Sequence, residues 1–450
     1  MHFYRFFFFM LILGTILSCQ EDENDTVNPY FQLTFSTDTL TFDTLFTGFA
    51  STTKQLKVKN TSSNAVSITH LYLLNSESAY RLNVNGTQSD DVSDIELDAK
   101  DSLYIFIEVD LPAMDEDAAR LIEDHLCFEV NGNLQEVILE TYAQDVYLVD
   151  EDIRESAVWT GNRPYLCTDS VWIDEGVDLL LQEGTKVYFT KNAALHVKGN
   201  LEIRGSFQQP VYFGSSRLEE LYENVPGQWD GIYFYNESNS ELLSHFILED
   251  GINGLKMVKT NFQEDSLNIE YGIIRNFTGK GIYLANTNLI AHDLLINNCG
   301  EECLRMEEEG SFELTHSTFY NAWYYSVRSS PVLFYQGSGK LQICNSIIWG
   351  SKTNELDINS VELTTVNYSL LKLSASKQET YVSVLQECLL NIDPDFSDLE
   401  EFDYRLNSDS PAINSGDTEF MSSFSVDLAG NSRDKDSAPD MGCFEYVEID

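Results

Sequence analysis

Positive charge is scarce in this sequence of 450 residues. Its 27 Lys and Arg stand against 73 Asp and Glu, which gives a formal net charge of −46 at pH 7. Such a chain repels nucleic acid and anionic lipid, so we expect neither as a partner. Hydrophobic residues still make up 43% and aromatic residues 12% of the chain, which argues for folded domains and against disorder.

Apolar runs long enough to cross a membrane are also lacking. The run from Phe6 to Leu17 spans about a dozen residues, too short for a bilayer and typical of an export signal. Residues 16–19, Ile-Leu-Ser-Cys, resemble a bacterial lipobox. This implies a signal peptide of residues 1–18 and a lipid on Cys19. The acidic tether 19–29 resembles the surface-export tag of Bacteroidetes lipoproteins. A chance cysteine and a plain solvated tether are the alternatives.

Familiar metal-binding and catalytic motifs are missing. The eight cysteines are scattered and no His lies at zinc-finger spacing, so we expect no metal site. If Cys19 carries lipid, an odd number of cysteines remains, and these cannot all pair. Cys299 and Cys303 lie close together in the sequence, either as a disulfide or, in the favoured interpretation, as buried free thiols. No P-loop, nucleophile elbow or dinucleotide fingerprint is present.

What the sequence does contain is a repeat, from residue 231 to 373, with a period of roughly 21 to 29 residues. Two strand-length runs alternate in it, and both lack helical spacing. Strand alternation predicts two inward columns: Ile232, Leu255, Ile282 and Leu304, and then Phe234, Met257, Leu284 and Met306. Stacked repeats of this kind share one core, so we predict a right-handed parallel β-helix.

The second run of each repeat ends in a residue type that tolerates left-handed backbone. The predicted turn column is Asp250, Asn276, Asn297, Asn321 and Gly350. It resembles the asparagine ladder of pectate-lyase-like β-helices. Glu249 and Asp250 beside Arg275 could start a glycoside hydrolase site, which needs two carboxylates at a set separation. With 73 acidic residues, however, some pair will always meet that condition.

Residues 30–147 are predicted to form a small all-β domain. About seven strand patterns fit a β-sandwich. The stretches TFDTLFTG, KVKNTSS, DSLYIFIEV and VNGNLQEVILETYA resemble immunoglobulin-like domains of the Hydin type. The sequence shows no catalytic constellation here, so we expect this domain to be a spacer or scaffold.

Residues 148–390 are predicted to form the β-helix. The stretches WTGNRPYL, GTKVYF, LHVKGNLEIRGS and PGQWDGIYF precede the repeats. From Trp159 onward the chain resembles Bacteroidetes right-handed β-helix lipoproteins. This resemblance is specific for architecture and uninformative about activity.

Residues 391–450 resemble the C-terminal segment of bacterial β-helix proteins, and we expect them to cap the open end of the solenoid. Arg433 is expected to pair with Asp427, Asp440 or Glu445. The rival interpretation of these acids is a Ca²⁺ site, because Ca²⁺ prefers oxygen ligands. Their spacing does not match an EF-hand loop.

One outward column could form a binding strip. The predicted members are Tyr233, Lys256, Tyr283 and Arg305, with Arg328 next. Aromatic rings stack on sugars, and Lys or Arg pairs with carboxylate or sulfate, so the strip suits an acidic polysaccharide. The alternative is an ordinary solvated sheet face. A second column, His245, Tyr271, His292 and His316, is too irregular to predict a metal site.

Together these patterns predict an all-β, monomeric lipoprotein held at the outer membrane by its lipid and exposed on the cell surface. It would be a non-catalytic module that binds a polysaccharide or a surface protein. The alternative is a polysaccharide lyase or glycoside hydrolase, with Lys256 or Arg305 as base. We see no clean set of base, carboxylate neutraliser and Ca²⁺, so we favour binding and expect no cofactor. Fold alone cannot choose between these hypotheses.

Overall fold

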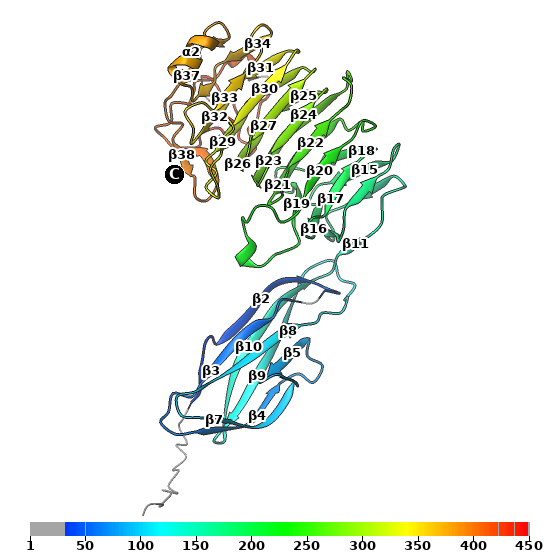
Figure 1. The fold of residues 1–450 in the computed structure, drawn as a ribbon, viewed down its shortest axis with the longest axis vertical. Coiled ribbons are helices and arrows are strands. Elements are labelled where there is room, and N and C mark those ends of the chain that lie inside the picture. The colour runs from blue at the N-terminus through cyan, green and yellow to red at the C-terminus, as the bar shows by residue number, and fades with distance from the viewer. Residues whose placement is uncertain (1–31, 50, 422, 436, 449–450) are drawn as a thin grey trace, which may run out of the picture. The chain divides into compact units, whose positions relative to one another are not determined.

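The computed structural model describes residues 32–49, 51–421, 423–435 and 437–448, and this part of the chain is almost entirely β-structure (Figure 1). The predicted signal peptide, Cys19 and the acidic tether therefore lie outside the described residues. None of the described helices is both long and apolar enough to cross a membrane.

The chain divides into two compact units. The first comprises Met1–Met114 and Ala119–Gln144, and the second comprises Asp115–Ala118 and Asp145–Asp450.

The first unit has two five-stranded sheets that share one apolar core. One sheet has the order β1 (Thr34–Phe35), β3 (Lys54–Lys59), β8 (Ser102–Val109), β5 (Tyr80–Val84), β6 (Thr87–Gln88). The other has the order β2 (Thr39–Phe46), β10 (Asn133–Gln144), β9 (Arg120–Val130), β4 (Val66–Leu73), β7 (Asp91–Leu97). Buried and exposed residues alternate along β8, because successive side chains of a strand point to opposite faces.

The second unit is built on parallel sheets. The larger sheet has 19 strands. In order these are β11 (Tyr147–Val149), β12 (Ala157–Trp159), β13 (Tyr165–Cys167), β15 (Asp178–Gln182), β16 (Lys186–Phe189), β18 (Asn200–Arg204), β19 (Val211–Ser215), β21 (Leu242–Glu249), β23 (Ser266–Phe277), β25 (Asn288–His292), β26 (Leu295–Cys299), β28 (Phe312–Thr315), β29 (Thr318–Asn321), β31 (Leu341–Cys344), β32 (Ile347–Gly350), β34 (Thr364–Asn367), β35 (Leu370–Leu371), β36 (Leu385–Gln386) and β37 (Leu389–Leu390).

A second parallel sheet has eight strands, drawn in Figure 1 as a row of arrows that ends at β33. Its order is β14 (Val171–Ile173), β17 (Ala194–Val197), β20 (Gly231–Phe234), β22 (Leu255–Val258), β24 (Ile282–Ala285), β27 (Leu304–Glu308), β30 (Leu333–Gly337) and β33 (Leu356–Ile358). Buried side chains of both parallel sheets form one continuous core.

The predicted inward columns are confirmed. Ile232 pairs with Leu255, Leu255 with Ile282 and Ile282 with Leu304, each in a parallel register. The column that begins with Phe234 pairs in the same way, and all eight side chains are buried. Each strand alone would expose its apolar face, so the pairing of successive repeats is what forms the core.

The predicted turn column is confirmed at Asp250 and Asn276. Asn321 and Gly350 pair in register but do not have positive φ angles. Asp250, Asn276 and Asn298 have positive φ angles, of 65°, 62° and 50°. The side-chain amide of Asn276 donates to Asp250 Oδ1 over 3.1 Å, and that of Asn298 donates to Asn276 Oδ1. Asn298, and not Asn297, therefore continues this ladder. Asn297 instead lies on the outer face of β26, in register with Arg275.

The end of the chain takes a different position from the predicted one. Leu295, Ile347 and Leu370 point away from the main core, and residues of the C-terminal segment such as Tyr404 and Met441 bury them. This segment, which includes the hairpin β38 (Phe396–Asp398) and β39 (Asp403–Leu406), thus covers the outer face of the 19-stranded sheet.

The last strand of the eight-stranded sheet is covered by the helix α2 (Ala375–Tyr381) (Figure 1). The hydroxyl of Tyr381 accepts a bond from the N–H of Ile358 in β33 over 2.8 Å. Tyr381 is fully buried in the main core, so α2 packs against that core through this side chain. Two short 3₁₀ helices, Glu220–Tyr222 and Thr418–Phe420, complete the elements.

Arg433 fastens the C-terminal segment to the sheet. Its guanidinium is fully buried and pairs with Glu445, a predicted partner, and with Asp293 at 2.5 Å, which the sequence did not suggest. Asp427 instead accepts backbone N–H groups of Ala429 and Asn431. A buried guanidinium needs such carboxylates, because it would otherwise lose its hydration without compensation.

Candidate functional site

Four of the five predicted strip residues form one column on the outer face of the eight-stranded sheet. Tyr233 pairs in register with Lys256, Lys256 with Tyr283, and Tyr283 with Arg305. All four are partly exposed. Neighbouring strands lie about 4.8 Å apart, so these side chains are direct neighbours along the column. We call them, with Phe334, the strip.

The prediction that Arg328 belongs to the strip is wrong. Phe334 of β30 is the register partner of Arg305. Arg328 lies in the connection before β30, where its side chain is only 2% exposed and forms two hydrogen bonds to Glu355, of 2.9 and 2.6 Å. The connection between β29 and β30 is longer than the three connections before it, so the basic residue falls outside the strand. Buried Arg328 has a structural ion pair in place of an outward position.

The lysine of the strip lies between two aromatic rings. The Lys256 ammonium is 5.8 Å from the ring centre of Tyr233 and 6.0 Å from that of Tyr283. The Tyr233 hydroxyl donates to Asp230 over 2.7 Å and accepts from the Asn253 amide. Cation–π contacts at partly exposed sites stabilise by about 0.5–1 kcal/mol each, so Lys256 keeps much of its capacity to bind a ligand.

The arginine of the strip is neutralised. Arg305 pairs with Glu302 at 2.9 Å and with Glu307. Burial raises the pKa of Glu307, but hydrogen bonds from Arg305 and Tyr283 outweigh it and hold the pKa below its ordinary value. Burial, and then the bond to Glu307, raises the pKa of Tyr283 to about 12. The middle of the strip therefore presents paired charges of both signs.

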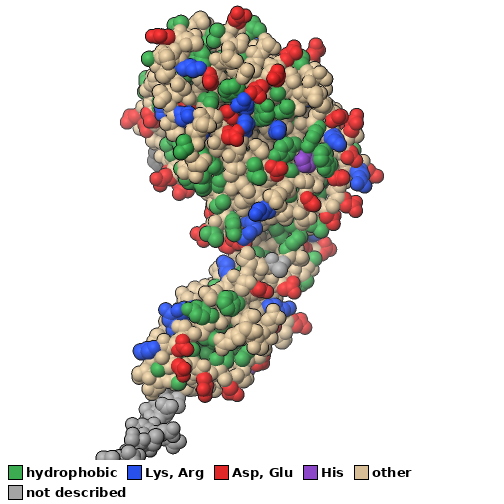
Figure 2. Space-filling view, in the orientation of Figure 1, with side chains coloured by type: hydrophobic (Ala, Val, Ile, Leu, Met, Phe, Trp, Pro, Cys, Tyr) green, Lys and Arg blue, Asp and Glu red, His purple; other side chains and the backbone are tan. Residues whose placement is uncertain are grey.

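The column continues beyond the predicted residues. Trp172 of β14 and His196 of β17 precede Tyr233 in register, and their rings stack at a centroid distance of 4.2 Å. Desolvation lowers the pKa of His196, so its imidazole is neutral at pH 7. In VWI and in the last three residues of ALHV, a ring-bearing residue lies between two buried aliphatic residues, a pattern that extends the column to all eight strands. Figure 2 shows hydrophobic, basic and acidic side chains intermixed over this sheet.

The two carboxylates beside Arg275 are both held by neighbours. Glu249 accepts from the Arg275 Nε over 2.6 Å and from the Tyr212 hydroxyl over 2.8 Å. Desolvation, followed by the charge of Glu249, raises the pKa of Asp250 to about 7. Asp250 is buried and belongs to the asparagine ladder, so this pair supports the turn more directly than it supports hydrolysis.

The residues of the histidine column lie where the backbone of the 19-stranded sheet bends. His245 and Tyr271 stack at 4.5 Å, and both have positive φ angles. His292 is hydrogen-bonded to Asp293, while His316 is buried beside Asn345. No cluster of three or more His, Cys, Asp or Glu suited to a metal ion occurs among the described residues. Cys299 and Cys303 are buried free thiols.

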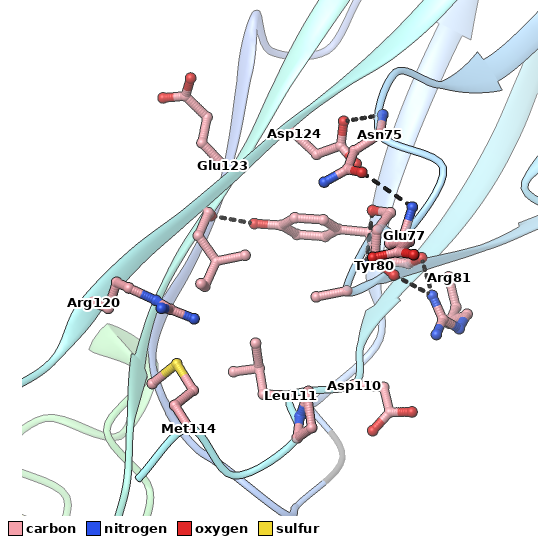
Figure 3. Close-up of a pocket in the computed structure, with 14 residues that line it drawn as sticks. Asn75, Glu77, Tyr80, Arg81, Asp110, Leu111, Met114, Arg120, Glu123 and Asp124 are labelled. Atoms are coloured by element: carbon pink, nitrogen blue, oxygen red, sulfur yellow. Dashed lines mark hydrogen bonds between the residues drawn. The ribbon is translucent and has the colours of Figure 1, made fainter. Parts of the chain in front are cut away.

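A cavity of about 460 Å³ opens in the first unit (Figure 3). The ring of Tyr80 crosses it, and the Tyr80 hydroxyl donates to the carbonyl of Ile122 over 2.9 Å. Arg120 and Met114 point into the cavity, whereas Glu123 points away. Its lining mixes basic and acidic side chains, so it does not select a ligand of one charge.

Comparisons with known proteins do not assign the chain to a family. No family profile and no curated protein matches it. A Porphyromonas gingivalis W83 protein of unknown function is similar at 10% identity, with a TM-score of 0.20, over 28% of this chain and 60% of that one. A PapD-like domain of human CEP192 is similar at 12% identity, with a TM-score of 0.19, over 28% and 96%. Scores this low carry no argument about fold or function.

Proposed function

We propose that the second unit is a right-handed parallel β-helix and that the first is an immunoglobulin-like β-sandwich. The register of successive repeats in both parallel sheets supports the first proposal, and the two sheets around one core support the second. The chain would be a Bacteroidetes-type lipoprotein, anchored in the outer membrane through Cys19 and exposed on the cell surface. The first unit then serves as a spacer.

We infer that the strip binds a glycan. The observation that carries this inference is the unbroken register of partly exposed aromatic and basic side chains from Tyr233 to Phe334. Side chains recur along it about every 4.8 Å, close to the length of one sugar unit in an extended polysaccharide. A linear glycan can therefore meet the same kind of contact at each unit, which multiplies weak contacts into useful affinity.

The charges favour a neutral glycan over the acidic one that the sequence suggested. Arg305 is already paired with Glu302 and Glu307, and Lys280 beside it pairs with Glu301 and Glu302. A uronate or sulfate would have to displace these carboxylates, whereas sugar hydroxyls can share the exposed edges of such pairs. Arg305 is also unsuited as the base of a lyase, because its two carboxylates keep its pKa above the ordinary value against the effect of burial.

The test uses the chain from Gln20 onward, which retains every described residue. We expect retention on an affinity gel that contains a neutral polysaccharide, and about tenfold weaker binding for Tyr283→Ala and Lys256→Ala. Lys340→Ala, an exposed lysine outside the strip, is the matched control. Absorbance of unsaturated uronate ends and new reducing ends measure turnover in parallel. Turnover lost in Lys256→Ala would replace the binding function with the enzymatic one. Equal binding by all variants would exclude the strip.

A further inference from the structure

A second site lies on the outer face of the other sheet. A cleft of about 280 Å³ separates the connection after β29 from the C-terminal segment. The side chains that shape it are largely aromatic: Tyr320, Tyr324, Leu399, Glu400, Phe402 and Tyr404. The strip belongs to the eight-stranded sheet, so the cleft shares no residue with it.

One wall of the cleft is an aromatic loop held open to solvent. Tyr324 is 67% exposed and stacks on Tyr325 with ring centres 4.3 Å apart. The Tyr325 hydroxyl donates to the carbonyl of Asn224 over 3.2 Å. Trp323 at the start of the loop and Arg328 at its end are buried. The loop is thus fastened at both ends, and the exposure of its rings is a property of the fold and not of a frayed segment.

The opposite wall comes from the connection between β38 and β39. Phe402 lies under the guanidinium of Arg275, 5.7 Å from its ring centre, and this contact fixes the ring. Tyr404 and Tyr320 pack together beneath, at a centroid distance of 5.2 Å. Leu399 and Glu400 are exposed at the rim. Rings on two sides, with a carboxylate at the edge, make a site that is apolar in its walls and polar at its mouth.

We propose that this cleft binds a single neutral sugar ring. Its volume falls just below the range of about 300–1,000 Å³ typical of drug-sized ligands, which suits one ring. The lining contains Glu400 but neither Lys nor Arg, and the chain carries a net charge of −46, so the site disfavours an anion. The exposed ring of Tyr324 can stack on the apolar face of a sugar while the Glu400 carboxylate accepts hydrogen bonds from the sugar hydroxyls.

The experiment is a titration of the chain from Gln20 onward with glucose, galactose, mannose and N-acetylglucosamine, followed by ligand-observed NMR. At least one of these sugars is expected to bind in the millimolar range. Tyr324→Ala should weaken that binding about tenfold and Glu400→Gln several-fold, while Tyr324→Phe, which keeps the ring, should bind nearly as wild type.

Val327→Ala is the matched control, because Val327 lies in the same loop, is 97% exposed and does not line the cleft. Unchanged thermal unfolding of Tyr324→Ala shows that the fold is intact. Binding that disappears in Lys256→Ala but survives in Tyr324→Ala would overturn the proposal and assign the sugar to the strip. The absence of binding by all four sugars would overturn it as well. Loss of sugar binding in Tyr324→Ala alone supports the cleft and says nothing about the strip, which the affinity-gel experiment tests separately.

Discussion

The two parallel sheets of the second unit differ in their outer faces: that of the eight-stranded sheet is partly exposed, and that of the 19-stranded sheet is covered. On the eight-stranded sheet, Tyr233, Lys256 and Tyr283 stay partly exposed and contact one another. On the 19-stranded sheet, Leu295 and Ile347 are buried under the C-terminal segment. Strand alternation produces an outward column in both cases. An outward column therefore becomes either an exposed surface or a second core, depending on whether a distant segment of the chain packs against it.

The largest effect is expected from removing Arg433, whose ion pairs hold the C-terminal segment on the 19-stranded sheet. Arg433→Met leaves Asp293 and Glu445 without their buried partner, and we expect a loss of about 5 kcal/mol in the free energy of unfolding. Urea unfolding measures this loss. Increased binding of a hydrophobic dye would report uncovering of the sheet. Arg405→Met, at an exposed pair with Asp403, should cost less than about 1 kcal/mol. Similar small losses in both variants would show that the covering segment does not depend on this ion pair.

The next test separates the two arginines that the sequence placed in one strip. Arg328→Met should lower the free energy of unfolding by about 3 kcal/mol, because Glu355 would remain buried and unpaired. Arg305→Met on the open face should cost about 1 kcal/mol, since Arg305 and Glu307 are partly exposed and Lys280 still pairs with buried Glu302. Chemical denaturation of both variants gives the ratio. An equal cost would mean that the open face is as tightly packed as the covered one.

A third test concerns the corner between strands, at Asp250. Its pKa of about 7 in the folded chain exceeds the value of about 3.9 expected when unfolded. The folded chain thus keeps a proton that the unfolded chain releases, so stability should fall from about pH 4 to 7 and level off above. Asp250→Asn should remove this slope and gain on the order of 2 kcal/mol at pH 8. Exposed Asp409→Asn is the control, and an unchanged slope in Asp250→Asn would contradict the account.

The smallest test compares two adjacent asparagines. Asn297 is buried on the covered face, and neither of its side-chain polar atoms has a hydrogen-bond partner among the described residues. Asn297→Leu should therefore raise the free energy of unfolding by about 1 kcal/mol. Asn298→Leu should lower it, because it breaks the bond to Asn276 at a position with a φ of 50°. A loss in Asn297→Leu would indicate that ordered water satisfies this amide.

Local periodicity explains which parts of the fold and site were predictable. The columns through Ile232 and Tyr233 follow from copies that begin at the same point of each repeat. Arg328 was misplaced because the connection before β30 is longer than the three connections before it. Asn297 was misplaced because its copy of the repeat was aligned one residue too early, at Leu294 in place of Leu295. The partnership of Arg433 with Asp293 joins residues 140 positions apart, so no local pattern reveals it. The cleft at Tyr324 was not predicted from the sequence for the same reason, because its walls come from segments that are far apart in the chain.

The most direct measurement is hydroxyl-radical footprinting of the chain from Gln20 onward, with and without a neutral polysaccharide that its affinity gel retains. We expect protection of Tyr233, Tyr283 and Phe334, the three rings of the strip, with buried Tyr381 unchanged as internal reference. Retention of the polysaccharide without protection of these rings would contradict the claim that the open face of the eight-stranded sheet is the binding surface.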